Sequence, residues 1–348
     1  MHTQATTGNE TCQIGNPDDQ GRRRSPIFGT LPPTHRKDAR VTEIRPARPD
    51  ELPALTTIAG DDERNAATAA YLTGLLESGA TRREWCLVAD PGTGIAAGNI
   101  VLWAPPGRDV PTDFVLFEPV DAGTAEALLA AAGDLARGLG AGRQAHVLDQ
   151  PAAAPQFQRD PDFRGKVLSA AGFGLDRDGR RFSWSAAAGV PATDPRLSWR
   201  SLAELGNQPF VDFIEDALRD TADAIFRAEI EEHGVRGAAE LNFADCLGFD
   251  HQPEWFEIGY AADGSPAALS LAANNGVVPI VALIAVSSAH RGQGFATSAL
   301  ARCTQVLAGT GATAIRGDCD VANTAMARAF ERCGYDNFAN RTMWSRPL

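Results

Sequence analysis

Residues 280–303 read IVALIAVSSAHRGQGFATSALARC, and this stretch decides the fold that we expect for the chain. The apolar run that ends at Val286 predicts a buried strand, and the apolar spacing of residues 296–307 predicts a helix. Between them, Gly292 and Gly294 lack Cβ atoms, so a ligand can approach the main chain closely. Free N–H groups and the positive dipole end at the start of a helix favour a phosphate or pyrophosphate. The segment therefore predicts a strand, a loop that holds an anion, and a helix.

The spacing Arg-x-x-Gly-x-Gly/Ala of this loop is weak evidence by itself, because it occurs a second time in the chain. Arg137, Gly140 and Gly142 have the same spacing, but they end a predicted helix instead of joining a strand to one. A phosphate needs the N-terminus of a helix. Only the copy at residues 291–296 therefore predicts an anion site.

Strands and helices alternate on both sides of this unit. We expect the same order of elements twice, and therefore an α/β fold with a mixed central sheet flanked by helices. In the second half, strands are predicted at 197–202, 255–261, 267–272, 278–286, 313–319 and 340–345, with helices at 204–233, 296–307 and 324–333. In the first half, strands are predicted at 41–45, 85–89, 96–103, 114–117 and 145–148, with helices near 49–58, 124–139 and 166–171, a further helical stretch between the first helix and the strand at 85–89, and a hairpin through 176–179 into 181–184.

The composition of the chain predicts where its domains begin and end, and it argues against several classes of function. Residues 1–40 predict a disordered tail, 41–185 a first domain, 186–196 a Pro/Ala/Gly linker and 197–348 a second domain. The net charge of −12 opposes broad adhesion to nucleic acid. No apolar run approaches the roughly 18 residues of a membrane span, and the N-terminus lacks a signal-peptide core. The six cysteines are scattered without a metal-binding spacing, so we expect a cytoplasmic protein with reduced thiols and no metal.

The strand Ile284–Val286, the loop at 291–296 and the segment NTAMARAFERCGY at 323–335 resemble, in order and spacing, the acyl-CoA signature of GNAT acyltransferases. The resemblance covers residues 197–348. It implies acetyl-CoA or another acyl-CoA as co-substrate, with the glycine loop on the pyrophosphate and the preceding strand on the pantetheine arm. The donor contacts that it implies are Ile284, Ala285, Val286, Arg291, Gly292, Gln293, Gly294, Phe295, Ala296, Thr297, Asn323 and Phe330.

Phe330 departs from the family pattern. It occupies the place where many members carry a tyrosine that protonates the departing CoA thiolate, and a phenyl ring has no proton to give. Another group or water donates this proton, or the thiolate leaves unaided, because a thiol pKa of about 8.5 makes it a fair leaving group.

Attack by an amine also needs a base, because the amine pKa is roughly 10. Asp318 and Asp320 stand two apart at the end of a strand and would point to one side, so they are the first candidates. The competing interpretation is a pair of carboxylates that cap the following loop. Glu257 and Tyr260 are second choices. Cys319 is set aside, since a small buried cysteine is far commoner than a nucleophile.

The first half resembles the same fold in its element order and in Ala171-Gly172-Phe173, which mirrors Cys333-Gly334-Tyr335. Its loop at 117–123 lacks the glycine pattern, and Glu118 and Asp121 would repel a pyrophosphate there. We therefore expect a degenerate copy that does not bind CoA.

Three functions follow from these observations. The first is an N-acyltransferase, most simply an acetyltransferase, that acts by direct attack on the amine of a small molecule. The second is an aminoacyltransferase that uses charged tRNA. The acidic net charge argues against this function, and the basic clusters at 22–24 and 35–37 are the reason to retain it. The third is an acyl-CoA-binding protein without turnover, suggested by Phe330 and the undeclared base. The acceptor and the oligomeric state are left open.

Overall fold

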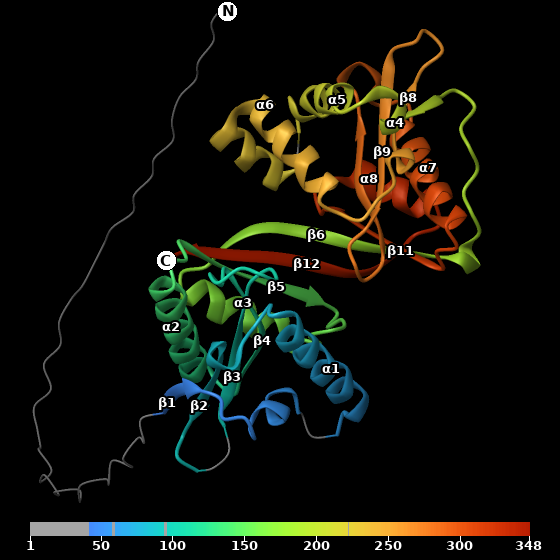
Figure 1. Cartoon of the computed structure of the whole chain (residues 1–348). Helices are drawn as coiled ribbons and strands as arrows, with labels where there is room; N and C mark the ends of the chain where they lie inside the picture. Colours follow the sequence, from blue (N-terminus) through green and yellow to red (C-terminus); the bar gives the residue numbers. More distant parts are fainter. Residues whose placement is uncertain (1–41, 58–59, 94–95, 222) are drawn as a thin grey trace, which may run out of the picture. The chain divides into compact units, whose positions relative to one another are not determined.

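The structure is a computed structural model that describes residues 42–57, 60–93, 96–221 and 223–348 (Figure 1). The predicted N-terminal tail, with its basic clusters, lies outside the described residues. Residues 41–348 form one compact unit. Both predicted domains and the predicted linker therefore belong to the same unit.

The first half follows the predicted order of elements, and its helices begin where the sequence supplies a cap. Asp61 and Asp160 each accept a backbone N–H three residues ahead, at 3.2 Å, so they cap α1 and α3. The elements are β1 (Glu43–Pro46), the 3-10 turn η1 (Leu52–Thr56), α1 (Asp62–Ser78), η2 (Arg83–Trp85), β2 (Cys86–Asp90), β3 (Gly98–Trp103), β4 (Asp113–Pro119), α2 (Ala122–Gly138), β5 (Arg143–Gln150), α3 (Pro161–Ala170) and β6 (Gly174–Ser185).

The second half has a corresponding order. The predicted cap Asn323 accepts the N–H of Met326 at 3.1 Å and begins α8. The elements are η3 (Ala186–Ala188), β7 (Ser198–Ser201), α4 (Leu202–Leu205), α5 (Gln208–Leu218), α6 (Ala224–Leu247), η4 (Pro253–Trp255), β8 (Phe256–Tyr260), β9 (Pro266–Asn274), β10 (Pro279–Val286), η5 (Ser288–His290), α7 (Phe295–Gly309), β11 (Ala314–Asp320), α8 (Thr324–Arg332) and β12 (Asp336–Pro347).

The two halves exchange strands within a single twelve-stranded sheet. Its order is β1-β2-β3-β4-β5-β12-β6-β11-β10-β9-β8-β7. β12 pairs with β5 and β6, which both belong to the first half, and β6 pairs with β11 and β12, which both belong to the second. Figure 1 shows β6 and β12 running side by side between the other strands. Each half therefore completes its sheet with a strand of the other.

The hairpin predicted at residues 176–179 is wrong. β6 passes through this segment as one continuous strand: residues 177–179 pair with β12, and pairing with β11 begins at Gly179. Its turn-forming polar residues are held extended because they bind across the sheet: Asp176 accepts from Arg143 at 3.1 Å, and Arg177 donates to Asp318 at 2.7 Å. Pairing with neighbouring strands overrides the local turn preference.

Two further elements differ from the prediction. The helical stretch predicted to end at residue 233 continues to Leu247, with a non-helical residue at Gly234 (φ 72°). The linker lies along α7: Gln305 donates to the Pro191 carbonyl at 2.8 Å, and Ser298 donates to Asp194. The linker therefore packs against α7 of the second half.

Helices cover both faces of the second-half strands. α5 and α6 lie on one side of β8 and β9, and α7 and α8 lie on the other (Figure 1). In β11, Gly317 faces α8, because a Cβ there would lie 2.7 Å from the Phe330 ring. Side chains alternate along a strand, so Arg316 and Asp318 face the α5–α6 side.

Candidate functional site

β10 and β11 meet at one pair of residues and then separate. Ile280 pairs with Arg316, and within the described residues no other pair joins the two strands, whereas β9 pairs with β10 as far as Val286. Alternate residues of 283–286 therefore direct their backbone N–H and C=O groups to the edge of β10 opposite β9, where no strand pairs with them. Every residue of β10 is half-buried, while residues 267–273 of β9 are fully buried. This open edge can pair with an extended ligand, which is the contact predicted for residues 284–286.

The loop before α7 presents a run of backbone N–H groups without acceptors. In the described part of the chain, the N–H groups of residues 292–296 make no hydrogen bond of normal length and angle, and the Thr297 N–H donates to the Gly294 carbonyl at 3.0 Å. Gly292 and Gly294 have φ of 79° and 87°, which glycine adopts without strain. No described side chain caps α7. Successive free amides at a helix start suit an anion, and the binding of a pyrophosphate here stays a prediction.

Side-chain contacts hold this loop in place. Arg196 donates to the Gln293 carbonyl at 3.1 Å, and its guanidinium lies 4.6 Å from the centre of the Phe295 ring. Hydrogen bonds from Arg196 hold the pKa of Asp194 well below its usual range, so this carboxylate stays charged beside it. The Arg291 side chain donates to the Ala217 carbonyl at 2.9 Å. Arg196 was not predicted, because it lies in the linker, far from the loop in sequence.

The corresponding loop of the first half carries its own anions. Asp121 accepts the N–H of Thr124 at 2.7 Å and caps α2. Glu118 is bound by Arg64 at 3.3 Å and by Arg164 at 2.5 Å. Glu118 and Asp121, the two carboxylates that were predicted to repel a pyrophosphate, are thus held at this loop. Asp121 also occupies one of the backbone N–H donors at the start of α2.

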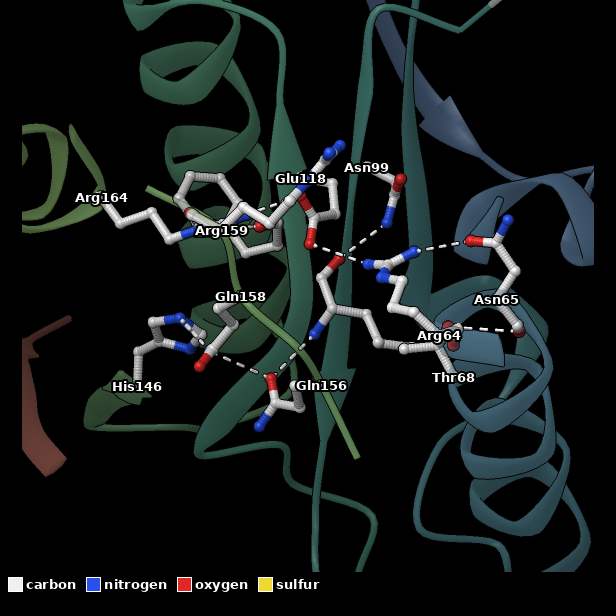
Figure 2. A network of polar contacts seen from close by, with 12 residues as sticks. Arg64, Asn65, Thr68, Asn99, Glu118, His146, Gln156, Gln158, Arg159 and Arg164 are labelled. Carbon is white, nitrogen blue, oxygen red and sulfur yellow. Dashed lines mark hydrogen bonds and ion pairs between the residues drawn. The ribbon is translucent and has the colours of Figure 1, made fainter. Parts of the chain in front are cut away.

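β4 and β5 also meet at a single pair before they separate, but here side chains bind the exposed strand (Figure 2). They come from β5 and from the segment that follows it. They are Gln156, which accepts the Leu116 N–H at 3.2 Å, His146, whose Nδ1 lies 2.7 Å from the Phe114 carbonyl oxygen, and Arg164, which donates to the Phe117 carbonyl. The backbone groups that stay open along β10 are therefore satisfied along β4.

This difference predicts one donor site per chain. Calorimetric titration with acetyl-CoA is expected to give a stoichiometry near one, because the amides before α7 and the edge of β10 are free, whereas side chains bind the edge of β4 and the start of α2. A stoichiometry near two would contradict the assignment, and a Gly294→Glu variant with no measurable site would place the single site in the second half.

The buried histidine of the first half makes the stability of the fold depend on pH. Burial lowers the pKa of His146 to about 3, so the folded ring is neutral and donates from Nδ1 to the Phe114 carbonyl. An unfolded histidine takes up a proton near pH 6.5. The contribution of His146 to the free energy of unfolding is therefore complete above pH 6.5. It is lost as pH falls towards 3, by at most roughly 1.4 kcal/mol per pH unit.

We expect His146→Gln to be less stable than wild type at pH 7 but to lose less stability between pH 7 and pH 4.5. Urea midpoints of both proteins at the two pH values measure this difference, because the carboxylates contribute equally to both. Equal losses in the two proteins would show that the ring is already protonated or exposed in the folded state.

The two predicted catalytic carboxylates have different surroundings. The side chain of Asp318 is 54% exposed and accepts from Arg177 at 2.7 Å. Asp320 is buried and accepts the Ala322 N–H at 2.8 Å, which is the loop-capping role that the sequence left open. A catalytic role for either carboxylate stays a prediction, and Asp318 has the better access to a substrate. Arg177 was missed because it lies on β6, in the other half.

The other predicted residues have structural contacts. Phe330 is 1% exposed and stacks on Phe182 at 4.4 Å, so this packing gives no support to the implied donor contact. Tyr335 is buried beside it, and its hydroxyl lies 2.8 Å from Thr304 Oγ1. Asn323 caps α8, as predicted, and its donor contact stays a prediction.

Of the second choices for a base, Tyr260 is half-buried, with the Arg200 guanidinium 6.0 Å from its ring centre, and its role stays a prediction. Glu257 and the cysteine that was set aside as a nucleophile are less suited to catalysis. Glu257 is buried and accepts two hydrogen bonds from Arg302, at 2.6 and 2.8 Å, so it forms a structural ion pair. Burial raises the pKa of the Cys319 thiol to about 12, so no thiolate nucleophile forms there near neutral pH.

Three further features of the described residues bear on function. They hold no group of three or more His, Cys, Asp or Glu side chains that could bind a metal ion. No described helix combines the length and apolarity needed to cross a bilayer. A cavity of about 470 Å³ lies between α3 and strands β5, β6 and β12, and none of the predicted donor residues lines it.

Comparisons with known proteins agree with this geometry. A family model described as the acetyltransferase (GNAT) family matches residues 197–335. A search of curated proteins gave no match. A GCN5-related N-acetyltransferase from Sphaerobacter thermophilus is 15% identical, covers 91% of this chain and 97% of its own, and has a TM-score of 0.55.

Two further solved structures are similar. A GCN5-related glucosamine N-acetyltransferase region in a fungal multi-domain GH3 beta-N-acetylglucosaminidase is 13% identical and covers 87% of this chain and 38% of its own, with a TM-score of 0.50. A tandem GNAT protein from the clavulanic acid biosynthesis pathway is 16% identical, covers 88% of this chain and 98% of its own, and has a TM-score of 0.44. At these identities the likeness to the first two structures concerns the fold.

Proposed function

Because residues 197–335 are a domain of the acetyltransferase (GNAT) family, we propose that this acyltransferase moves an acetyl group from acetyl-CoA to the amine of a small molecule. The observation that carries the proposal is the run of free N–H groups at residues 292–296, at the start of α7. These amides suit the pyrophosphate, and the open edge of β10 suits the pantetheine arm.

In this reaction the amine nitrogen bonds to the acyl carbon, the carbon–sulfur bond breaks, and the amine loses one proton. Asp318 is the proposed acceptor of that proton, directly or through one water, because its carboxylate is accessible on the sheet face beside the separation of β10 and β11. Phe330 has no proton for the thiolate, and Tyr335 is buried. The thiolate therefore leaves unaided or takes its proton from water.

The acceptor is proposed to lie on the α5–α6 side of the sheet, since α7 and α8 pack on the other side. Arg177 connects this face to the segment between α5 and α6, because its guanidinium lies 2.7 Å from Asp318 and 3.8 Å from Asp223. The net charge of −12 weighs against charged tRNA as the donor.

The test is release of CoA thiol from acetyl-CoA in the presence of a panel of small amines, monitored continuously. We expect sustained release with at least one amine and loss of that release in Gly294→Glu. Tight binding of acetyl-CoA without release for any amine would support the third function, a donor-binding protein without turnover, and would overturn the proposal.

A further inference from the structure

The sheet face that carries Asp318 has its charges divided between two ends. At one end, which we call the carboxylate end, Asp223, Asp318 and Asp320 lie around Arg177. At the other, the arginine end, Arg181 and Arg341 bind Asp149, and Arg316 lies near Arg181. Most of these residues lie on the adjacent strands β12, β6 and β11, beside the point where β10 and β11 separate, while Asp149 lies on β5 and Asp223 in the segment before α6.

Asp149 is the shared partner at the arginine end. It is buried on β5 and accepts from Arg181 at 2.7 Å and from Arg341 at 2.8 and 2.7 Å. One carboxylate therefore serves two guanidinium groups. Burial lowers the pKa of Arg181, and the charges of Arg341 and Arg316 lower it further, as expected where cations outnumber anions.

Arg316 is the arginine without an anion. In the described part of the chain its guanidinium makes no hydrogen bond or ion pair, and its contact is with the ring of Phe338, whose centre lies 4.0 Å away. Arg181 lies 4.9 Å from the same ring. Phe338 is the residue at which the β12 register shifts, and Arg316 is the residue of β11 that pairs with Ile280 of β10. A half-buried guanidinium with unused N–H donors thus lies at the strand separation.

We propose, on the basis of the proposed function, that the acceptor is an amine that also carries a carboxylate. The carboxylate binds Arg316, and the amine faces Asp318. A guanidinium presents paired donors that match a carboxylate, and Phe338 fixes its plane. Arg316 and Asp318 are two residues apart on one face of β11, about 6.6 Å along the strand. This spacing suits an amine and a carboxylate separated by a few bonds.

The experiment compares matched acceptors with the full chain and acetyl-CoA. The panel consists of the common amino acids, β-alanine and γ-aminobutyrate, each beside its carboxamide, which keeps the amine and removes the negative charge. We expect at least one acid to be acetylated with a KM about 10- to 100-fold lower than that of its amide. Equal KM values for acid and amide, or turnover confined to amines without a carboxylate, would overturn the proposal.

The variant Arg316→Gln locates the effect. It is expected to raise the KM of the preferred acid about 10- to 100-fold, to leave the KM of its amide within about threefold, and to leave acetyl-CoA affinity unchanged. Arg332→Gln, an exposed arginine on α8, is the matched control and should change none of these values. An equal loss for acid and amide in Arg316→Gln would assign Arg316 a structural role and contradict the proposal.

Failure of this inference can be told apart from failure of the proposed function. If acetyl-CoA binds and another class of amine is acetylated, the proposed function stands and the carboxylate-bearing acceptor is wrong. If no member of the panel is acetylated but acetyl-CoA binds, calorimetry with the acids decides: absence of carboxylate-dependent binding would overturn the inference separately.

Discussion

Separate expression of residues 41–189 and 190–348 is expected to give two chains that do not fold alone. β6 has both of its strand partners in the second fragment, and β12 has both of its partners in the first. Each fragment would lose hydrogen bonds along three strand edges and expose core residues such as Trp184 and Trp344. A domain is stable by only about 5–15 kcal/mol, so such a loss exceeds its margin.

Co-expression should restore the fold. The two fragments are expected to purify as a one-to-one complex with a single cooperative melt and one acetyl-CoA site, and each alone should be insoluble or lack a cooperative melt. Size-exclusion chromatography and thermal unfolding measure both outcomes. A monomeric 190–348 fragment that melts cooperatively and binds acetyl-CoA would show that the strand exchange is not needed for folding.

Replacing Gly294 by glutamate is expected to weaken acetyl-CoA binding about 100-fold. Gly294 has φ of 87°, so a side chain there strains the backbone by roughly 1–2 kcal/mol. The new carboxylate would also stand at the start of α7, where it competes for the free amides and repels the pyrophosphate. Together these effects amount to about 2.8 kcal/mol, which is a factor of about 100 in the dissociation constant.

Two other variants separate the causes in the same calorimetric titration. Gly294→Asn tolerates the left-handed backbone and adds no charge, so it should weaken binding by less than Gly294→Glu. Gly309→Glu, an exposed position at the far end of α7, should leave the affinity unchanged. Unchanged affinity in Gly294→Glu would place the donor elsewhere and remove the basis of the proposed function.

Local signals in the sequence predicted most of the elements. Asn323 predicted the start of α8 because a helix cap is a contact between residues three apart. The continuous strand β6 was not predicted, because Asp176 and Gly179 favour a turn and the strands that oppose this turn are distant in sequence. The length of α6 was missed because Gly234 lies in its middle.

The candidate site was predictable only on the donor side. The loop at 291–296 could be read from spacing, because its glycines and the helix it begins are contiguous. The residues beside Asp318 could not be predicted from spacing, since Arg177 lies 141 positions away in the chain. Arg196 and Arg316 likewise carry no local signal, because an arginine in a linker or a strand is usual on any soluble surface.

The sequence by itself determined the glycine loop and the free amides at the start of α7, since glycine conformations and the exposed amides of a helix start are fixed within a few neighbouring residues. Only the tertiary structure decided which strand lies beside which. Strand edges offer the same N–H and C=O groups whatever their sequence, so the exchange of β6 and β12 and the division of charge around Arg177 and Asp149 follow from packing of the whole chain.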